Sequence, residues 1–253
     1  MLVRPDGDAV LLISQNAHAW VSGQIARAWK TDDDHAFEPY EEVCLAAELH
    51  DIGWQTWEGN PTLNPETGVP YTFRELPRRE YLQVWTRARR FSTIINRYAA
   101  LLISRHGTRL LARYGPAEDA PRAEKEQIEG FLRREAAAQG RLIESLAESP
   151  RYEPFVSDEV LDRNSGLIST WDGMSLMLCG GLPDDGITIG DYTMTPDEDG
   201  TVRVDPWPFT REQVQLVVEG RRLTGRYERQ ITLQSALQKA EWQTLQFDLV
   251  TAE

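Results

Sequence analysis

The chain has 253 residues, 41% of them hydrophobic, and a formal net charge of −13. Its length and apolar content suffice for a sizeable core, and eight Trp, eight Tyr and seven Phe residues spread along it argue against disorder. The negative charge excludes a protein that binds duplex nucleic acid or an anionic membrane through general electrostatic attraction, since both need a positive surface. A phosphorylated small molecule stays compatible, because it needs only a locally positive pocket or a metal.

Two cysteines, Cys44 and Cys179, lie far apart and both in apolar surroundings. This usage suits a reducing compartment rather than a disulfide framework. The first residues do not read as a signal peptide, and the longest apolar runs are too short to cross a bilayer. We therefore expect a cytoplasmic protein.

The first half of the chain reads as helices behind a short hairpin. Apolar runs on either side of the turn sequence Pro5-Asp6-Gly7-Asp8 predict a β-hairpin over residues 2–13. Ser14 or Asn16 is suited to cap the next helix, which extends to about residue 29. Gly53 suits the end of a second helix, where a left-handed residue is often required. Helical periodicity predicts this second helix over residues 39–52 and further helices over residues 78–96, 97–114, 121–148 and 156–180.

The pattern changes near residue 187, after which apolar and polar residues alternate between tight turns. This period of two indicates antiparallel strands, with a short helix over residues 231–241 and a final strand over residues 242–250. We therefore predict a mainly α fold. It consists of a helical domain over residues 1–182, which begins with the hairpin, and a β-rich C-terminal subdomain over residues 183–253 packed on it.

Four predicted helices each carry ligand-type side chains on an otherwise apolar face. His50 and Asp51 lie together at the end of the second helix, while His18, His106 and Asp172 lie on three others. A buried carboxylate is costly unless it is paired with a charge or bound to a cation. Each residue alone is weak evidence, because a single buried histidine is more often a hydrogen-bonded core residue. One metal site would explain all four helices.

The chemistry of this set limits the metal. Two or three imidazoles with two carboxylates suit one or two divalent ions of Fe, Mn, Zn, Ni or Co better than Ca or Mg.

Arg109 follows His106 by one helical turn and can present a guanidinium to a phosphate or carboxylate, although a surface salt bridge is an equal alternative. Four tryptophans near the candidate ligands can stack on a planar group or simply fill the core. They are Trp20, Trp54, Trp57 and Trp171.

The order His, His-Asp and a distant Asp, each on its own helix, resembles the HD-domain superfamily of metal-dependent phosphohydrolases. The resemblance implies an HD-domain-like helical bundle with His18, His50, Asp51 and Asp172 as metal ligands. It places His106 where some members add a histidine for a second metal. About 120 residues separate Asp51 from Asp172, more than in compact members, so Asp158 or Asp162 is an alternative last ligand. Four strings are more narrowly similar to an uncharacterised bacterial family within the superfamily: QNAHAWVSG (15–23), HDIGW (50–54), SRH (104–106) and WDGMSL (171–176).

From this resemblance we expect a metal-dependent hydrolase of a small phosphorylated molecule, such as a nucleotide, that acts through metal-activated water. Asp51 would orient that water or bridge two metals, with His106 and Arg109 as further catalytic residues. A di-iron oxygenase with the same ligands is one alternative, since some relatives have that chemistry. A non-catalytic, metal-stabilised binding protein is the other.

Overall fold

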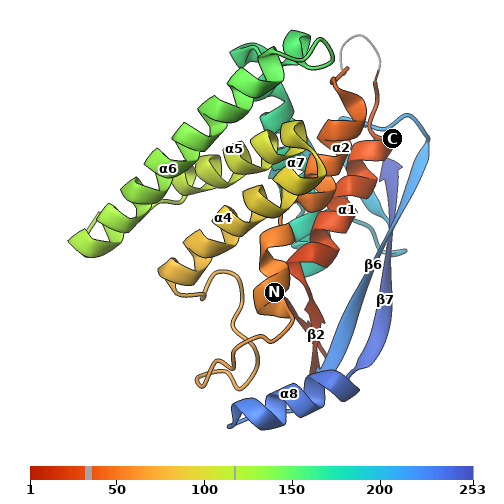
Figure 1. The fold of residues 1–253 in the computed structure, drawn as a ribbon. Helices are drawn as coiled ribbons and strands as arrows, with labels where there is room; N and C mark the ends of the chain where they lie inside the picture. Colours follow the sequence, from red (N-terminus) through yellow and green to blue (C-terminus); the bar gives the residue numbers. More distant parts are fainter. Residues whose placement is uncertain (32–35, 117, 253) are drawn as a thin grey trace.

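A seven-stranded sheet forms one side of the molecule (Figure 1). The structure, a computed structural model, describes residues 1–31, 36–116 and 118–252. The strands of the sheet follow the order β1-β2-β6-β7-β5-β4-β3. Neighbouring strands are antiparallel, except for β5 and β7, which are parallel to each other. The strands are β1 (Leu2–Asp6), β2 (Ala9–Ile13), β3 (Ile187–Ile189), β4 (Tyr192–Pro196), β5 (Val202–Asp205), β6 (Gln213–Thr224) and β7 (Glu241–Thr251).

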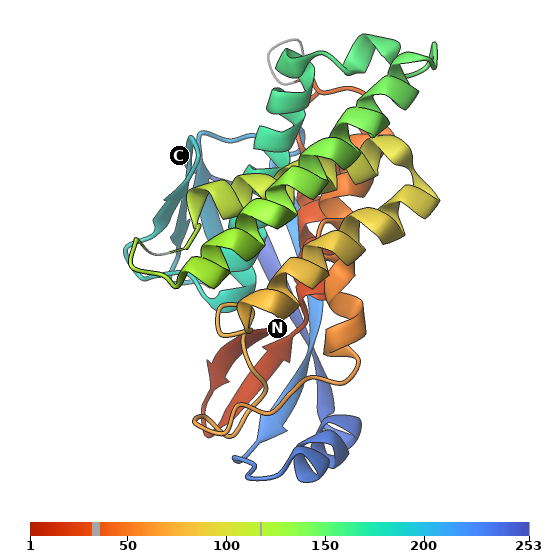
Figure 2. The same ribbon diagram turned by 60° about the vertical axis from the view of Figure 1, so that its left-hand side comes forward.

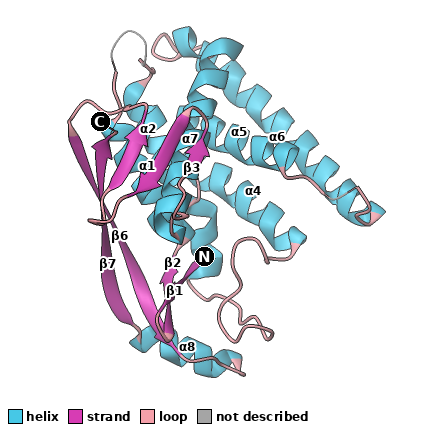
Figure 3. Ribbon diagram, turned by 180° about the vertical axis from the view of Figure 1, so that it is seen from behind, coloured by secondary structure: helices cyan, strands magenta, loops and turns pink. Residues whose placement is uncertain are grey.

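Most of the helices cover one face of this sheet (Figures 1 and 3). Strand β6 shows why, because its alternate residues Val214, Leu216 and Val218 are buried. None of the helices in the described residues is long and apolar enough to cross a membrane. The helices are α1 (Gln15–Ala28), α2 (Tyr40–Leu49), α3 (Gln55–Glu58), α4 (Arg78–Ile95), α5 (Arg97–Arg113), α6 (Arg122–Ala147), α7 (Asp158–Gly180) and α8 (Gln230–Lys239), with single 3-10 turns η1 (Ile52–Trp54) and η2 (Glu153–Phe155).

The helices form layers around α1. This helix packs against α2 and α7 and, on its other side, against β6. Figure 2 shows α6 (green) lying across α4 and α5, so that it is the helix furthest from the sheet. Helix α8 covers the far end of the long strands β6 and β7, where Leu233 and Leu237 pack on Leu12 and Leu223 (Figure 1).

The predicted fold class, a mainly α HD-domain-like helical bundle with an N-terminal β-hairpin and a β-rich C-terminal appendage, is wrong. The N-terminal hairpin and the C-terminal strands belong to one curled mixed sheet, because β2 pairs with β6, with Leu12 opposite Arg221. Alternation predicts which side chains of a strand are buried, but it does not identify the partner strand. Residues 1–182 and residues 183–253 both contribute strands to this sheet. The division of the chain into two domains at residue 182 stays a prediction.

The structure confirms the predicted helix cap at Ser14 and corrects the predicted role of Gly53. Ser14 caps α1, and its Oγ accepts a hydrogen bond from the Ala17 N–H at 3.0 Å. Gly53 lies inside η1, and its φ lies outside the left-handed region. A Cβ at this position would lie 2.0 Å from the Val84 carbonyl oxygen and 2.7 Å from the Ala88 nitrogen. Position 53 is therefore a glycine because α4 passes too close for any side chain.

Candidate metal centre

The five predicted ligand residues come together where four helices meet. His18 comes from α1, His50 and Asp51 from the turn between α2 and η1, His106 from α5 and Asp172 from α7. All five are buried, and even the most exposed, Asp172, keeps only 7% of its surface in contact with solvent. The helices bring the residues together because α1 packs on α2 and α7, and α5 packs on α2 and α7.

In this cluster the imidazole nitrogens of the histidines face the carboxylate oxygens of the aspartates. His18 Nε2 lies 2.9 Å from Asp51 Oδ2. His50 Nε2 lies 3.3 Å from Asp172 Oδ1 and 3.7 Å from Asp51 Oδ2, while His106 Nε2 lies 3.4 Å from Asp172 Oδ2. Two overlapping triads could each hold a metal ion, with ligand atoms within 4.8 Å of one another: His18, His50 and Asp51, and then His50, His106 and Asp172. His50 belongs to both.

The hydrogen bonds of His50 fix its tautomer. Its Nδ1 lies 2.8 Å from the carbonyl oxygen of Ala47, which can only accept, so Nδ1 carries the hydrogen. In the neutral ring, Nε2 therefore presents a lone pair toward two carboxylates. His50 Nε2 and both ring nitrogens of His106 are buried without a hydrogen-bond partner among the described residues. Each such atom costs roughly 1–3 kcal/mol. A cation between the two Nε2 atoms and the carboxylates removes that cost for His50 and for one nitrogen of His106, so the residues fit a metal.

The electrostatics of the cluster favour a positive charge. Burial opposes protonation of His50, but the neighbouring Asp51 and Asp172 carboxylates outweigh it and raise the pKa of His50 to about 9. Burial likewise opposes the charge on Asp172, yet the adjacent His106 and His50 rings hold the pKa of its carboxyl well below the usual range. The Asp172 carboxylate thus stays ionised in a buried place, where it attracts a proton or a metal cation.

A second layer of hydrogen bonds, which was not among the predictions from the sequence, orients the ligands. The Oγ of Ser175 lies 2.9 Å from His18 Nδ1, and the Oγ of Ser22 lies 2.8 Å from that of Ser175. The indole N–H of Trp54 donates to Asp51 Oδ1 at 3.2 Å. Ser22 follows His18 by four residues in a helix, so helical spacing was a signal that could have found it. Such partners set the orientation and basicity of metal ligands.

Arg109 makes a surface ion pair. Its Nη1 lies 3.1 Å from Asp162 Oδ1, and 46% of its side chain is exposed. Arg105 pairs with the same carboxylate at 2.6 Å. Asp162, considered above as an alternative ligand, is thus engaged at the surface, whereas Asp172 joins the cluster. A phosphate-binding role for Arg109 stays a prediction.

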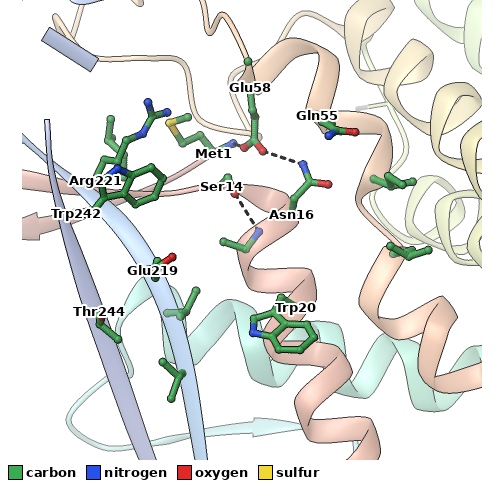
Figure 4. A pocket seen from close by; sticks show the side chains of 17 residues that line it. Met1, Ser14, Asn16, Trp20, Gln55, Glu58, Glu219, Arg221, Trp242 and Thr244 are labelled. Atoms are coloured by element: carbon green, nitrogen blue, oxygen red, sulfur yellow. Dashed lines mark hydrogen bonds and ion pairs between the residues drawn. The ribbon is translucent and has the colours of Figure 1, made fainter. Parts of the chain in front are cut away.

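Beside the cluster lies a cleft of about 980 Å³, lined by α1, α3 and the strands β6 and β7 (Figure 4). Trp20 and Trp242 line it and are 48% and 63% exposed, whereas Trp54 and Trp171 are buried core residues. Arg221 lines it too and places its guanidinium 5.6 Å from the Trp242 ring. The five ligand residues do not line the cleft, but residues next to three of them in sequence do: Ala17, Leu49 and Ile52.

A family model matches most of the chain. The family model described as "Protein of unknown function (DUF3891)" matches residues 1–225, which include all five ligand residues and most of the sheet. No curated protein and no solved structure matches the chain.

Proposed function

The chain belongs to the DUF3891 family of proteins of unknown function, and from that premise we propose that it is a metal-dependent phosphohydrolase. In this proposal His18, His50, Asp51, His106 and Asp172 bind one or two divalent transition-metal ions, as their resemblance to the HD-domain superfamily implies. The substrate is a small phosphorylated molecule, such as a nucleotide.

One observation carries the proposal. Nε2 of His50 and of His106 are buried, lack hydrogen-bond partners among the described residues and face ionised carboxylate oxygens 3.3 and 3.4 Å away. A structural core histidine normally uses both ring nitrogens in hydrogen bonds. Ring nitrogens that converge with carboxylates in this way, without hydrogen bonds, suit a cation between them instead.

The ligand set favours Fe, Mn, Zn, Ni or Co, since imidazole and carboxylate suit all five. A bound ion of this kind lowers the pKa of a coordinated water and polarises a phosphoryl oxygen. Asp51 has the contacts to orient a reacting water, because its Oδ1 is held by Trp54 and its Oδ2 faces His18 and His50. The helices around the cluster exclude bulk water from it.

The cleft offers groups that suit the substrate. Trp20 and Trp242 present exposed faces on which a base or other planar group can stack, and Arg221 supplies a positive charge for a phosphate. The overall charge of −13 opposes duplex nucleic acid or a membrane as a partner.

Elemental analysis of the purified protein tests the metal site. We expect about one or two equivalents of transition metal in the wild type, lost in His50→Ala and Asp51→Ala and retained in Asp185→Ala, an exposed carboxylate. Hydrolysis of a panel of phosphate esters with that metal, abolished in the first two variants, then tests the reaction. A wild-type protein that contains no metal and takes up none of Mn, Fe, Zn, Ni or Co contradicts the proposal.

A di-iron oxygenase is the second candidate, and the histidine–carboxylate pairs on either side of His50 favour it. His18 with Asp51 and His106 with Asp172 would place two ions as close neighbours, with the one free nitrogen of His50 bound to one of them. Two equivalents of iron and an absorption spectrum that changes on reduction, without phosphatase activity, would identify this chemistry. If chelation lowers Tm sharply and neither reaction occurs, the metal serves stability alone.

A further inference from the structure

Gln15, the first residue of α1, connects the cleft to the metal cluster. It is buried, with 3% of its surface exposed. Its backbone N–H donates to both carboxylate oxygens of Glu58, at 2.8 and 3.0 Å. Glu58 lines the cleft, and it also accepts a hydrogen bond from Asn16 at 3.3 Å (Figure 4). The start of α1 is therefore held from the cleft side.

On the cluster side, the Gln15 amide reaches Asp51. Its Nε2 donates to Asp51 Oδ2 at 3.2 Å. This is the oxygen that lies 2.9 Å from His18 Nε2 and 3.7 Å from His50 Nε2. The contact determines the orientation of the amide, because a carboxylate oxygen accepts from N–H and repels a carbonyl oxygen. Gln15 thus holds the oxygen on which the first triad converges.

The other end of the amide has no partner. Gln15 Oε1 is buried and accepts no hydrogen bond from any described residue. It is bonded to the same carbon as Nε2, so it lies close to the Asp51 carboxylate. A buried acceptor without a donor costs free energy unless it meets a donor or a cation. His50 Nε2, in the same triad as Asp51, shows the same deficit, which a single cation there would resolve for both atoms.

We propose that Gln15 is a further residue of the metal centre, whose Nε2 positions Asp51 and whose Oε1 is a neutral oxygen ligand for the cation beside His18, His50 and Asp51. The inference rests on the proposed metal site and specifies its preference. An amide carbonyl is a hard oxygen ligand, and it suits Mn²⁺ better than Zn²⁺. Zn²⁺ is already bound well by imidazole ligands alone. Gln15 therefore biases the site toward Mn²⁺.

Titration of the metal-free protein with Mn²⁺ and with Zn²⁺ tests this role. We expect Gln15→Met, which keeps the length of the side chain and removes both polar atoms, to weaken Mn²⁺ binding by about 10- to 100-fold, the usual effect of losing such a partner. Zn²⁺ binding should weaken less. Gln83→Met makes the same change at an exposed position on α4 and should leave both affinities unaltered.

A second variant separates a role in metal binding from a role in folding alone. Gln15→Glu puts a carboxylate beside Asp51, so we expect a lower Tm without metal and a larger rise in Tm on adding Mn²⁺ than in the wild type. A purely structural Gln15 would instead lower Tm equally with and without Mn²⁺ in either variant. Should Gln15→Met fail to fold, this comparison decides.

Two outcomes overturn the inference, and they differ in meaning. A wild type that binds Mn²⁺, together with a Gln15→Met variant of equal Mn²⁺ affinity, rejects the role of Gln15 and leaves the metal site standing. A wild type that binds neither Mn²⁺ nor Zn²⁺ rejects the proposed function and this inference together.

Discussion

Replacing Gly53 with alanine should destabilise the protein, because the turn that carries Asp51 packs directly on α4. The added Cβ would meet the Val84 carbonyl oxygen at 2.0 Å and the Ala88 nitrogen at 2.7 Å. Both are backbone atoms, so no rotamer change can relieve the contact. Either η1 or α4 must move.

The expected magnitude follows from two opposing effects. Overpacking of this kind costs typically about 1–3 kcal/mol, and a backbone clash belongs at the upper end. Alanine also restricts the unfolded chain, which returns roughly 0.4–1 kcal/mol. The net loss of about 2 kcal/mol lowers Tm by roughly 4–8 °C for a chain of this size.

Thermal unfolding followed by circular dichroism checks this value, and Gly140→Ala is the matched control. Gly140 lies inside α6 with nothing within 4 Å of its would-be Cβ. Alanine there should stabilise the protein by roughly 0.5–1 kcal/mol. Opposite signs for the same substitution would support the packing argument. A Gly53→Ala variant that unfolds at or above the wild-type Tm would refute it.

Three further outcomes are expected. Ser175→Ala removes the hydroxyl 2.9 Å from His18 Nδ1 and should weaken metal binding by about 10- to 100-fold in a metal titration; an unchanged affinity would show that Ser175 does not orient the ring. Trp54→Phe keeps an aromatic ring but removes the N–H that holds Asp51 Oδ1, so the same titration should show weaker binding. Because Trp54 is fully buried, the smaller ring should also lower the metal-free Tm. Glu42 is buried, which opposes its charge, but hydrogen bonds from an arginine and a tyrosine lower its pKa below the ordinary 4.5. The Glu42 carboxylate therefore stabilises the protein fully above pH 4.5, and this stabilisation is lost as the pH falls through the lowered pKa. When the pH is lowered from 4.5 through that pKa, the Tm of the wild type should fall more than the Tm of Glu42→Gln.

The sequence alone determined the local structure. The helices lie close to their predicted ranges because the spacing of apolar residues along a helix is a property of neighbouring residues. The same spacing identified His18, His50, His106 and Asp172 as polar groups on apolar faces. Each of them is buried and they meet at one place, since the apolar faces that carry them pack together.

Only the tertiary structure decided which elements pair and what supports the site. The hairpin over residues 2–13 pairs with β6, more than 200 residues later, and no local pattern specifies that choice. Gly53 reads locally as a helix end, whereas the approach of α4 is what excludes a side chain there. Gln15 reads as an ordinary first-turn residue until the fold places Asp51 against its amide. The physical reason is common to all three: alternation and helical spacing report which face of an element is buried, and the partner on that face comes from elsewhere in the chain.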